Sequence, residues 1–199
     1  LTDHGNLYGA IEFYKKAKAA GVKPILGIEA YIAPTNANTQ EKYFHLILLC
    51  KNKTGWQNLL KLITHAHLEG FYYKPRISKE MLRRHSEGLI ALSACLSGEL
   101  SRLISAHKFQ EAETIAREYN NIFGQGNFFI EIGPHPGVKE TIFTTQRLTT
   151  IARNTGIPLV ATQDIHYLKQ EDARYHDILL AVQTGNKLND SDRLTLKDD

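Results

Sequence analysis

The residues with the clearest potential for chemistry lie together near the carboxyl end of the chain. Asp164 and His166 follow a short apolar run, Pro158 to Ala161, which predicts a buried strand. Side chains two residues apart in an extended segment project the same way, so a carboxylate oxygen and an imidazole nitrogen can point at one spot. Such a pair suits a divalent metal, but it needs further ligands from elsewhere in the chain.

The elements that would position these residues alternate along the chain. Apolar runs predict strands at 24–32, 44–50, 88–94, 127–132 and 158–162, separated by segments with helical periodicity. This alternation predicts a parallel sheet with crossover helices, for which an open doubly wound sheet and a barrel both fit. Neither Gly-x-Gly-x-x-Gly nor Gly-x-x-x-x-Gly-Lys occurs, which removes the usual nucleotide-binding interpretation of an open sheet.

Ligand-type side chains follow several of the expected strands. In parallel α/β folds, chemistry collects in the loops at the carboxyl ends of strands. Packing does not require carboxylates, imidazoles and thiols to recur at these positions, so their recurrence indicates a common site. Besides the opening pair, these side chains are Asp3, His4, Cys95, Glu131 and His135.

Two further candidates fit this rule less simply. Glu29 lies within its strand, although an inward-facing carboxylate near the mouth of a barrel would still reach a central metal. A carboxylate in an apolar strand needs a partner, because a buried unpaired charge is costly. His45 lies at the beginning of its strand, the wrong end for a parallel barrel. Either that strand runs in an unusual direction or its boundaries differ from those expected.

A mixture of imidazole, carboxylate and thiolate ligands indicates the kind of metal. It suits zinc, manganese or iron better than magnesium or calcium, which prefer oxygen ligands alone. Several carboxylates and imidazoles converging on one place indicate more than one ion. A multinuclear site of this kind typically activates a water and clamps a phosphate for in-line displacement.

Length and composition set the broad class of the protein. The chain has 199 residues, 42% of them hydrophobic, and a net charge of +3, as expected for a globular domain with one sizeable core. Cys50 and Cys95 give no disulfide framework, and no run is apolar enough for a membrane span or a signal peptide. We therefore expect a cytoplasmic protein with no membrane partner.

Six blocks in order along the chain resemble one known family. They are similar to the PHP (polymerase and histidinol phosphatase) domain, in the version at the amino end of the alpha subunit of bacterial DNA polymerase III. The likeness covers essentially the whole chain, including Leu179–Gly185. The six blocks are Leu1–Gly5, Lys23–Tyr31, Tyr43–Leu46, Glu69–Tyr72, Leu92–Leu96 and Ala161–Tyr167.

The resemblance implies a fold, a cofactor and a ligand set. The fold would be an α/β, distorted TIM-like (β/α)7 barrel with a cluster of two or three zinc or manganese ions at its mouth. Asp3 would hold or orient His4. The implied metal ligands are His4, Glu29, His45, Cys95, Asp164 and His166.

The resemblance also implies that the chain is incomplete. The family's first motif, His-x-His on the first strand, is not present and would lie just before Leu1. We therefore expect a fragment that lacks the first strand and is inactive alone. Residues 1–185 would form the PHP domain, and residues 186–199 would begin the connection to the polymerase region.

The implied chemistry is phosphoester hydrolysis by a metal-activated water. In polymerase members the substrate would be the 3′ end of DNA, which makes the domain a proofreading exonuclease within a chain that carries out DNA-directed DNA synthesis. DNA and the other subunits of the replicative polymerase holoenzyme would be its partners. No polymerase catalytic residue can be assigned here.

Alternatives remain open at this point. The aromatic and basic stretch 71–76 could contact DNA through Lys74 and Arg76, or its rings could pack on the rim of the barrel. A free-standing PHP phosphatase acting on a small phosphomonoester is a second possible function. A non-catalytic scaffold for a proofreading partner is a third.

Overall fold

The chain folds as a mixed α/β domain in which helices pack around one sheet. The computed structural model describes residues 1–34, 42–133, 139–191, 193 and 195. The strands are β1 (Thr2–His4), β2 (Gly27–Ala33), β3 (Phe44–Cys50), β4 (Phe71–Tyr72), β5 (Lys74–Ser78), β6 (Leu89–Leu92), β7 (Phe128–Ile132) and β8 (Leu159–Ala161). The helices are α1 (Ala10–Ala19), α2 (Lys53–Leu68), α3 (Lys79–Arg84), α4 (Glu99–Ser105), α5 (Phe109–Phe123), α6 (Lys139–Thr155), the short 3-10 helix η1 (Gln170–Asp172) and α7 (Ala173–Thr184).

The sheet is open in the described part of the chain. Its strand order is β4-β5-β2-β3-β6-β7-β8, and β1 pairs with β2. Both β1 and β5 lie along one edge of β2, β1 at Gly27–Glu29 and β5 at Tyr31–Ala33. The closed TIM-like barrel that the resemblance implies is therefore not seen here, because β8 pairs with β7 and no described strand joins it to β1.

The direction of β3 corrects the prediction of a parallel sheet. β3 runs antiparallel to both of its neighbours, β2 and β6, whereas β1 with β2, β2 with β5, β6 with β7, and β7 with β8 are parallel. The beginning of β3 therefore lies beside the carboxyl end of β2. The bounds predicted for this strand, 44–50, are those observed.

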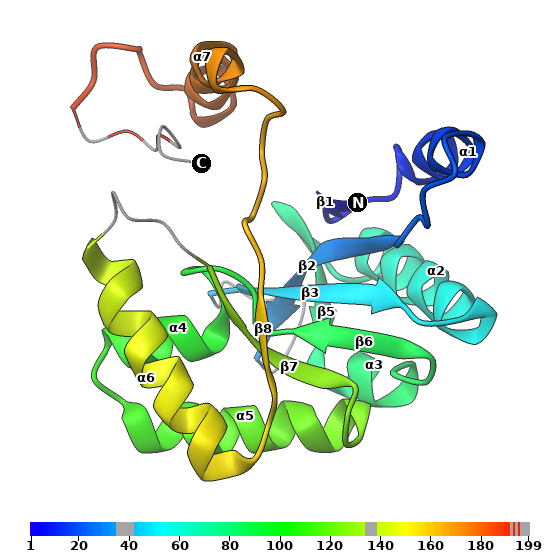
Figure 1. Ribbon diagram of the computed structural model, residues 1–199, viewed down its shortest axis with the longest axis vertical. Coiled ribbons are helices and arrows are strands. Elements are labelled where there is room, and N and C mark those ends of the chain that lie inside the picture. Colours follow the sequence, from blue (N-terminus) through cyan, green and yellow to red (C-terminus); the bar gives the residue numbers. More distant parts are fainter. Residues whose placement is uncertain (35–41, 134–138, 192, 194, 196–199) are drawn as a thin grey trace.

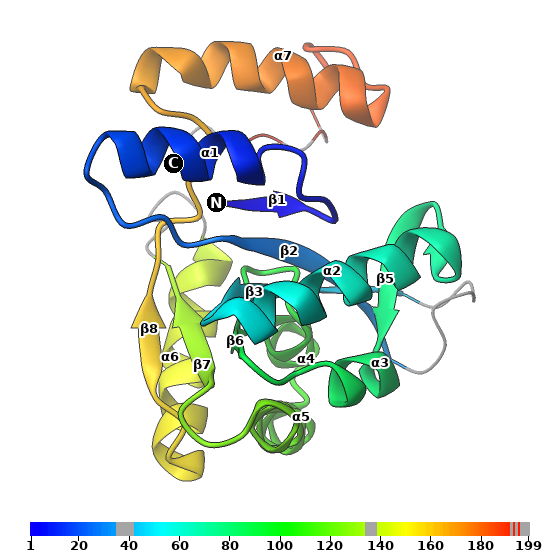
Figure 2. The same ribbon diagram turned by 90° about the vertical axis from the view of Figure 1, so that its right-hand side faces the viewer.

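The core lies between the central strands and the helices. α4, α5 and α6 pack against one another on one side of the sheet, and α1 and α7 lie at the opposite end of the molecule in both views (Figures 1 and 2). The largest core cluster joins strand residues such as Ile28 and Leu48 to helix residues such as Leu59, Leu100 and Tyr119. None of the helices in the described residues is both long and apolar enough to cross a membrane.

The strand predicted at 158–161 is confirmed as β8, Leu159–Ala161, but the prediction that it is buried is wrong. β8 is a short edge strand, and Leu159 is 39% exposed. An apolar run of this length is equally compatible with an edge strand and a central one, because periodicity does not report how many neighbours a strand has. Because β8 is parallel to β7, the residues that follow these two strands still lie at the same end of the sheet.

Candidate metal centre

Three neighbouring strands bring His4, Glu29 and His45 together. His4 ends β1 opposite Glu29 in the middle of β2, because β1 pairs only with the first half of that strand. His45 lies opposite Tyr31 near the start of β3, which the antiparallel pairing turns back toward the same end of the sheet. One ligand atom from each of His4, Glu29 and His45 lies within 4.8 Å of the others.

Glu29 is the centre of this group. Its Oε1 lies 2.5 Å from Nδ1 of His45, and its Oε2 lies 3.6 Å from Nε2 of His4. Glu29 is only 4% exposed, whereas the side chain of His4 is 45% exposed. The group is therefore buried on the side of Glu29 and open to solvent on the side of His4.

A tight turn after β6 adds Cys95 to the group. The Cys95 Sγ lies 3.9 Å from Oε1 of Glu29 and 3.9 Å from Nδ1 of His45. Ala94, the residue before it, has a φ of 63°, in the left-handed region that non-glycine residues seldom adopt. The turn is held against β3, because the backbone N–H of His45 donates to the carbonyl of Ser97 at 3.0 Å.

Asp164 and His166 lie beside the group, in a backbone geometry other than the one predicted. Asp164 has a φ of 49° and lies outside any strand, so the expected extended segment is wrong. Instead, Nδ1 of His166 donates to the carbonyl oxygen of Asp164 at 2.6 Å, which makes Nε2 the nitrogen that would bind a metal. The His166 ring lies 6.3 Å from the His4 ring, centroid to centroid.

Burial and charge set the protonation of the group. Burial lowers the pKa of His4, against the opposing charge of Glu29, so this imidazole is neutral at pH 7. Burial alone would raise the pKa of Glu29, but the hydrogen bond from His45 and the nearby imidazoles outweigh it, and the net pKa is lowered. Burial and the charge of Glu29 raise the pKa of Cys95 to about 12.

The donor set fits a divalent metal such as zinc. Ligands at about 2.0–2.3 Å from one tetrahedral ion lie roughly 3–4 Å apart, which the contacts of Cys95 and His4 with Glu29 already satisfy. His45 and Glu29 are closer than that, and would separate slightly to hold an ion between them. An ionised carboxylate and a neutral imidazole are the forms that bind metal.

Other predicted residues lie around this group rather than in it. Asp3 directs a carboxylate oxygen toward Gly9, and its proposed role of holding His4 stays a prediction. The Nζ of Lys74 lies 5.7 Å from the centroid of the Tyr31 ring, which stacks on His4. Arg76 is only 4% exposed and lies between the rings of Tyr43 and Tyr72, 5.0 Å from each centroid. His135 falls outside the described residues.

Two residues near the group differ from what the sequence alone indicates: Arg76 is buried, and Tyr31 is a neighbour of the group. Arg76 packs with Tyr72, as in the alternative in which the stretch 71–76 packs on the rim, whereas Phe71 and Tyr73 are exposed. A DNA contact by Arg76 stays a prediction that would require this buried side chain to move. Tyr31 is not among the candidates from the sequence. Its spacing of two residues from Glu29 is the signal that could identify it, because it places both side chains on the same face of β2.

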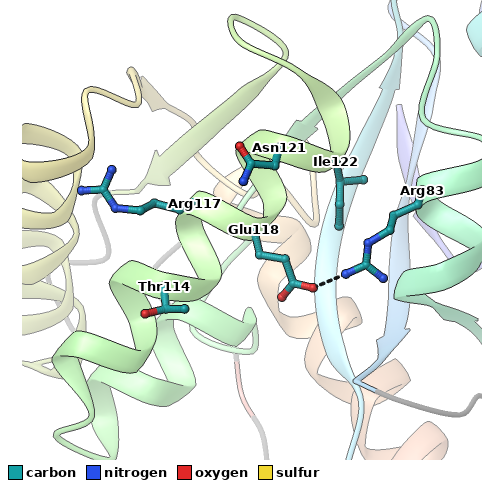
Figure 3. A pocket seen from close by; sticks show the side chains of 6 residues that line it. All are labelled: Arg83, Thr114, Arg117, Glu118, Asn121 and Ile122. Carbon is teal, nitrogen blue, oxygen red and sulfur yellow. Dashed lines mark hydrogen bonds and ion pairs between the residues drawn. The ribbon is translucent and has the colours of Figure 1, made fainter.

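A separate hollow lies on the outer surface of the helices. It has a volume of about 520 Å³ and is lined by Arg83 of α3 and by residues of α5. The guanidinium group of Arg83 points toward the carboxylate of Glu118 (Figure 3). Arg83 and Glu118 form an ion pair at 2.5 Å across it. None of its lining residues belongs to the predicted metal site. The six are Arg83, Thr114, Arg117, Glu118, Asn121 and Ile122.

Comparison with known proteins places the chain in a family. The PHP domain model matches residues 1–135. DNA polymerase III subunit alpha of Thermus aquaticus is 50% identical over 97% of this chain and 16% of its own length, and that of Borreliella burgdorferi is 46% identical over 99% and 18%. The subunit of Treponema pallidum is 45% identical over 100% of this chain and 17% of its own length. The chain thus spans less than a fifth of these relatives. The chain belongs to the PHP domain family, and it matches the PHP region of the bacterial DNA polymerase III alpha subunit.

Proposed function

We propose that this chain is the metal-dependent phosphodiesterase domain of a replicative DNA polymerase, acting as a 3′–5′ exonuclease on DNA. The observation that carries the proposal is the convergence of His4, Glu29 and His45 at one end of the sheet. Its support comes from relatives that are DNA polymerase III alpha subunits. The proposed domain covers residues 1–185, and residues 186–199 begin the connection to the polymerase region.

The proposed chemistry divides between the ions and the chain. Bound divalent ions, zinc or manganese, would supply an activated water and positive charge for the phosphoryl oxygens. Glu29, His4 and His45 would hold an ion at the closed side of the site. Cys95, Asp164 and His166 would complete the ligand set from the strand exits beside them.

The open side of the site faces the substrate in this proposal. The half-exposed His4 marks where a phosphodiester would enter. Tyr31 stacks beside it as a neutral phenol, because burial raises its pKa to about 12. Lys74, which is partly buried and lies near that ring, would contact a DNA phosphate. DNA and the other subunits of a cytoplasmic polymerase holoenzyme would be its partners.

The test uses the full-length protein and 3′-labelled single-stranded DNA. We expect release of labelled nucleotides that a chelator abolishes and Zn²⁺ or Mn²⁺ restores. His45→Ala should reduce the rate at least 100-fold, whereas His65→Ala, in the last turn of α2 and paired with Glu69, should leave it unchanged. DNA synthesis by each variant controls for folding.

Three results would contradict the proposal. The first is a His45→Ala variant that cleaves DNA as fast as the wild type. The second is a wild-type protein that cleaves p-nitrophenyl phosphate but not DNA, which would favour the small-molecule phosphatase. The third is a wild-type protein that binds no metal and cleaves neither, which would favour the scaffold.

A further inference from the structure

Glu131 occupies a place in the sheet between two predicted ligands. β7, which carries it, lies between β6 and β8, and all three strands are parallel. The exit of β6 leads to Cys95, and the exit of β8 leads to Asp164. Glu131 is the next-to-last residue of β7, opposite Val160 of β8. Three adjacent parallel strands therefore deliver ligand-type side chains to the same edge of the sheet.

The Glu131 carboxylate is buried and only half satisfied. Glu131 is 9% exposed, and its Oε1 accepts a hydrogen bond from Oγ1 of Thr162 at 2.5 Å. Its Oε2 is buried and has no hydrogen-bond partner among the described residues. A buried carboxylate oxygen without a partner is costly, so its presence needs an explanation.

Neighbouring charges act on the Glu131 carboxyl group. Burial and the negative charges of Asp164 and Glu29 raise the pKa of Glu131, against the hydrogen bonds from Thr162 and the backbone of Ala94. The charge of Glu131 in turn contributes to the raised pKa of Cys95. Glu131 therefore shares one electrostatic environment with the metal group. No ion pair among the described residues supplies it with a cation.

We propose that Glu131 is a further ligand of the proposed metal centre, whose Oε2 binds a divalent ion while the Thr162 hydroxyl holds Oε1 in place. The proposal rests on the proposed metal-dependent function and extends its ligand set to β7. A divalent ion at this position would satisfy the orphaned oxygen and neutralise neighbouring carboxylates, which is the role that bound cations commonly take. Thr162 is then a positioning residue, because it fixes the orientation of a ligating carboxylate.

The test compares metal binding in four forms of the full-length protein: wild type, Glu131→Gln, His45→Ala and the control Glu111→Gln. Glu111 is an exposed carboxylate on α5, paired with Lys108 and remote from the sheet edge. Each form is stripped with a chelator and titrated with Zn²⁺ and Co²⁺, with the bound ions counted by elemental analysis. We expect Glu131→Gln to lose one ion, or to bind one ion at least tenfold more weakly, with altered Co²⁺ visible bands.

A second measurement follows hydrogen exchange at the peptides covering β7 and β8. In the wild type, Zn²⁺ should slow exchange at these peptides at least tenfold, and in Glu131→Gln it should slow exchange less than twofold. Where Glu131→Gln fails to fold, Glu131→Asp serves instead, because a carboxylate shorter by one methylene should still bind Co²⁺ but with shifted bands and weaker affinity.

The outcomes separate this inference from the proposed function. Unchanged stoichiometry, affinities within twofold and identical Co²⁺ bands in Glu131→Gln would overturn the assignment of Glu131. If His45→Ala loses metal in the same experiment, the proposed centre stands without Glu131. If His45→Ala also binds metal normally, the proposed centre itself fails.

Discussion

A metal bound at Cys95 would change the protonation state of this side chain. Its thiol lies 3.9 Å from both Glu29 and His45, in surroundings that raise its pKa to about 12. At pH 8 only about one such thiol in ten thousand is ionised. A metal ligand must be a thiolate, so binding an ion at Cys95 releases a proton.

Metal affinity should therefore depend on pH through Cys95. Between pH 7 and 9 the metal-free thiol is protonated, so the logarithm of the Zn²⁺ affinity should rise by about one unit per pH unit. His4 contributes no proton in this range, because its pKa is lowered and it is already neutral. Competition titrations at several pH values measure the slope. Cys95→Ser should flatten it, and equal slopes in the two proteins would show that Cys95 is not a ligand.

Cys50 offers a contrast in the same molecule. Burial raises its pKa to about 11, and it lies at the end of β3 away from the metal group. Metal should leave its reactivity unchanged. It should be labelled slowly by a thiol reagent at pH 8 in the folded protein, with or without Zn²⁺, and rapidly after unfolding. Fast labelling of Cys50 in the folded protein would contradict its burial.

At the scale of elements, the turn between β6 and α4 connects the fold to the site. Gly98 is the N-cap of α4, forms a bridge with His45 and allows the turn to close. A Cβ at Gly98 would lie 2.1 Å from the carbonyl oxygen of Ser93 and 3.1 Å from that of Cys95. Its φ of −65° is ordinary, so close packing against backbone, and not conformation, requires the glycine.

Gly98→Ala should destabilise both the fold and the metal group. Forcing a methyl group against backbone costs about 1–3 kcal/mol, and opening the turn would move Cys95 from its neighbours. Chemical unfolding and Zn²⁺ titration measure the two effects. Gly9→Ala is the matched control for the unfolding measurement, because Gly9 also precedes a helix and a Cβ there would meet only side-chain atoms of Asp3 and Leu1. Equal losses at Gly98 and Gly9 would contradict this account of the turn.

At the scale of the whole molecule, one buried ion pair network joins three helices. Lys79 of α3 contacts Glu99 of α4 at 3.0 Å and Glu118 of α5 at 2.8 Å. The Tyr119 hydroxyl donates to the second oxygen of Glu99 at 2.7 Å. α3 follows β5, whereas α4 and α5 lie between β6 and β7 in the chain. The network therefore connects the first half of the chain to the second.

Removing Lys79 should therefore cost more than removing a surface lysine. Lys79→Met leaves Glu99 and its charge buried without their cation, for which about 3–5 kcal/mol is expected. Lys108→Met breaks an exposed pair with Glu111 and should cost less than about 1 kcal/mol. Denaturant unfolding measures both. Adding Glu99→Gln to Lys79→Met should recover part of the loss, and its failure to do so would argue against the buried charge as the cause.

Local pattern was enough to predict several elements. The apolar run 44–50 matches β3 at both ends, and the segments of helical periodicity between the predicted strands contain α2, α4, α5 and α6. Residue chemistry at the strand exits indicated a metal site, whereas the set His4, Glu29, His45, Cys95, Asp164 and His166 came from the family resemblance and stays a prediction. Secondary structure can be predicted from short stretches of sequence, because the period of apolar side chains differs between a helix and a strand.

Only the tertiary structure decided how these residues meet. The antiparallel direction of β3 brings His45 to the carboxyl end of β2, and the position of β1 along β2 sets His4 opposite Glu29. The surroundings of the Glu131 carboxylate, with Thr162 on one oxygen and none of the described residues on the other, also come from pairing between strands distant in sequence. Local periodicity is the same for either strand direction and for an edge or a central strand, so long-range pairing alone determines them.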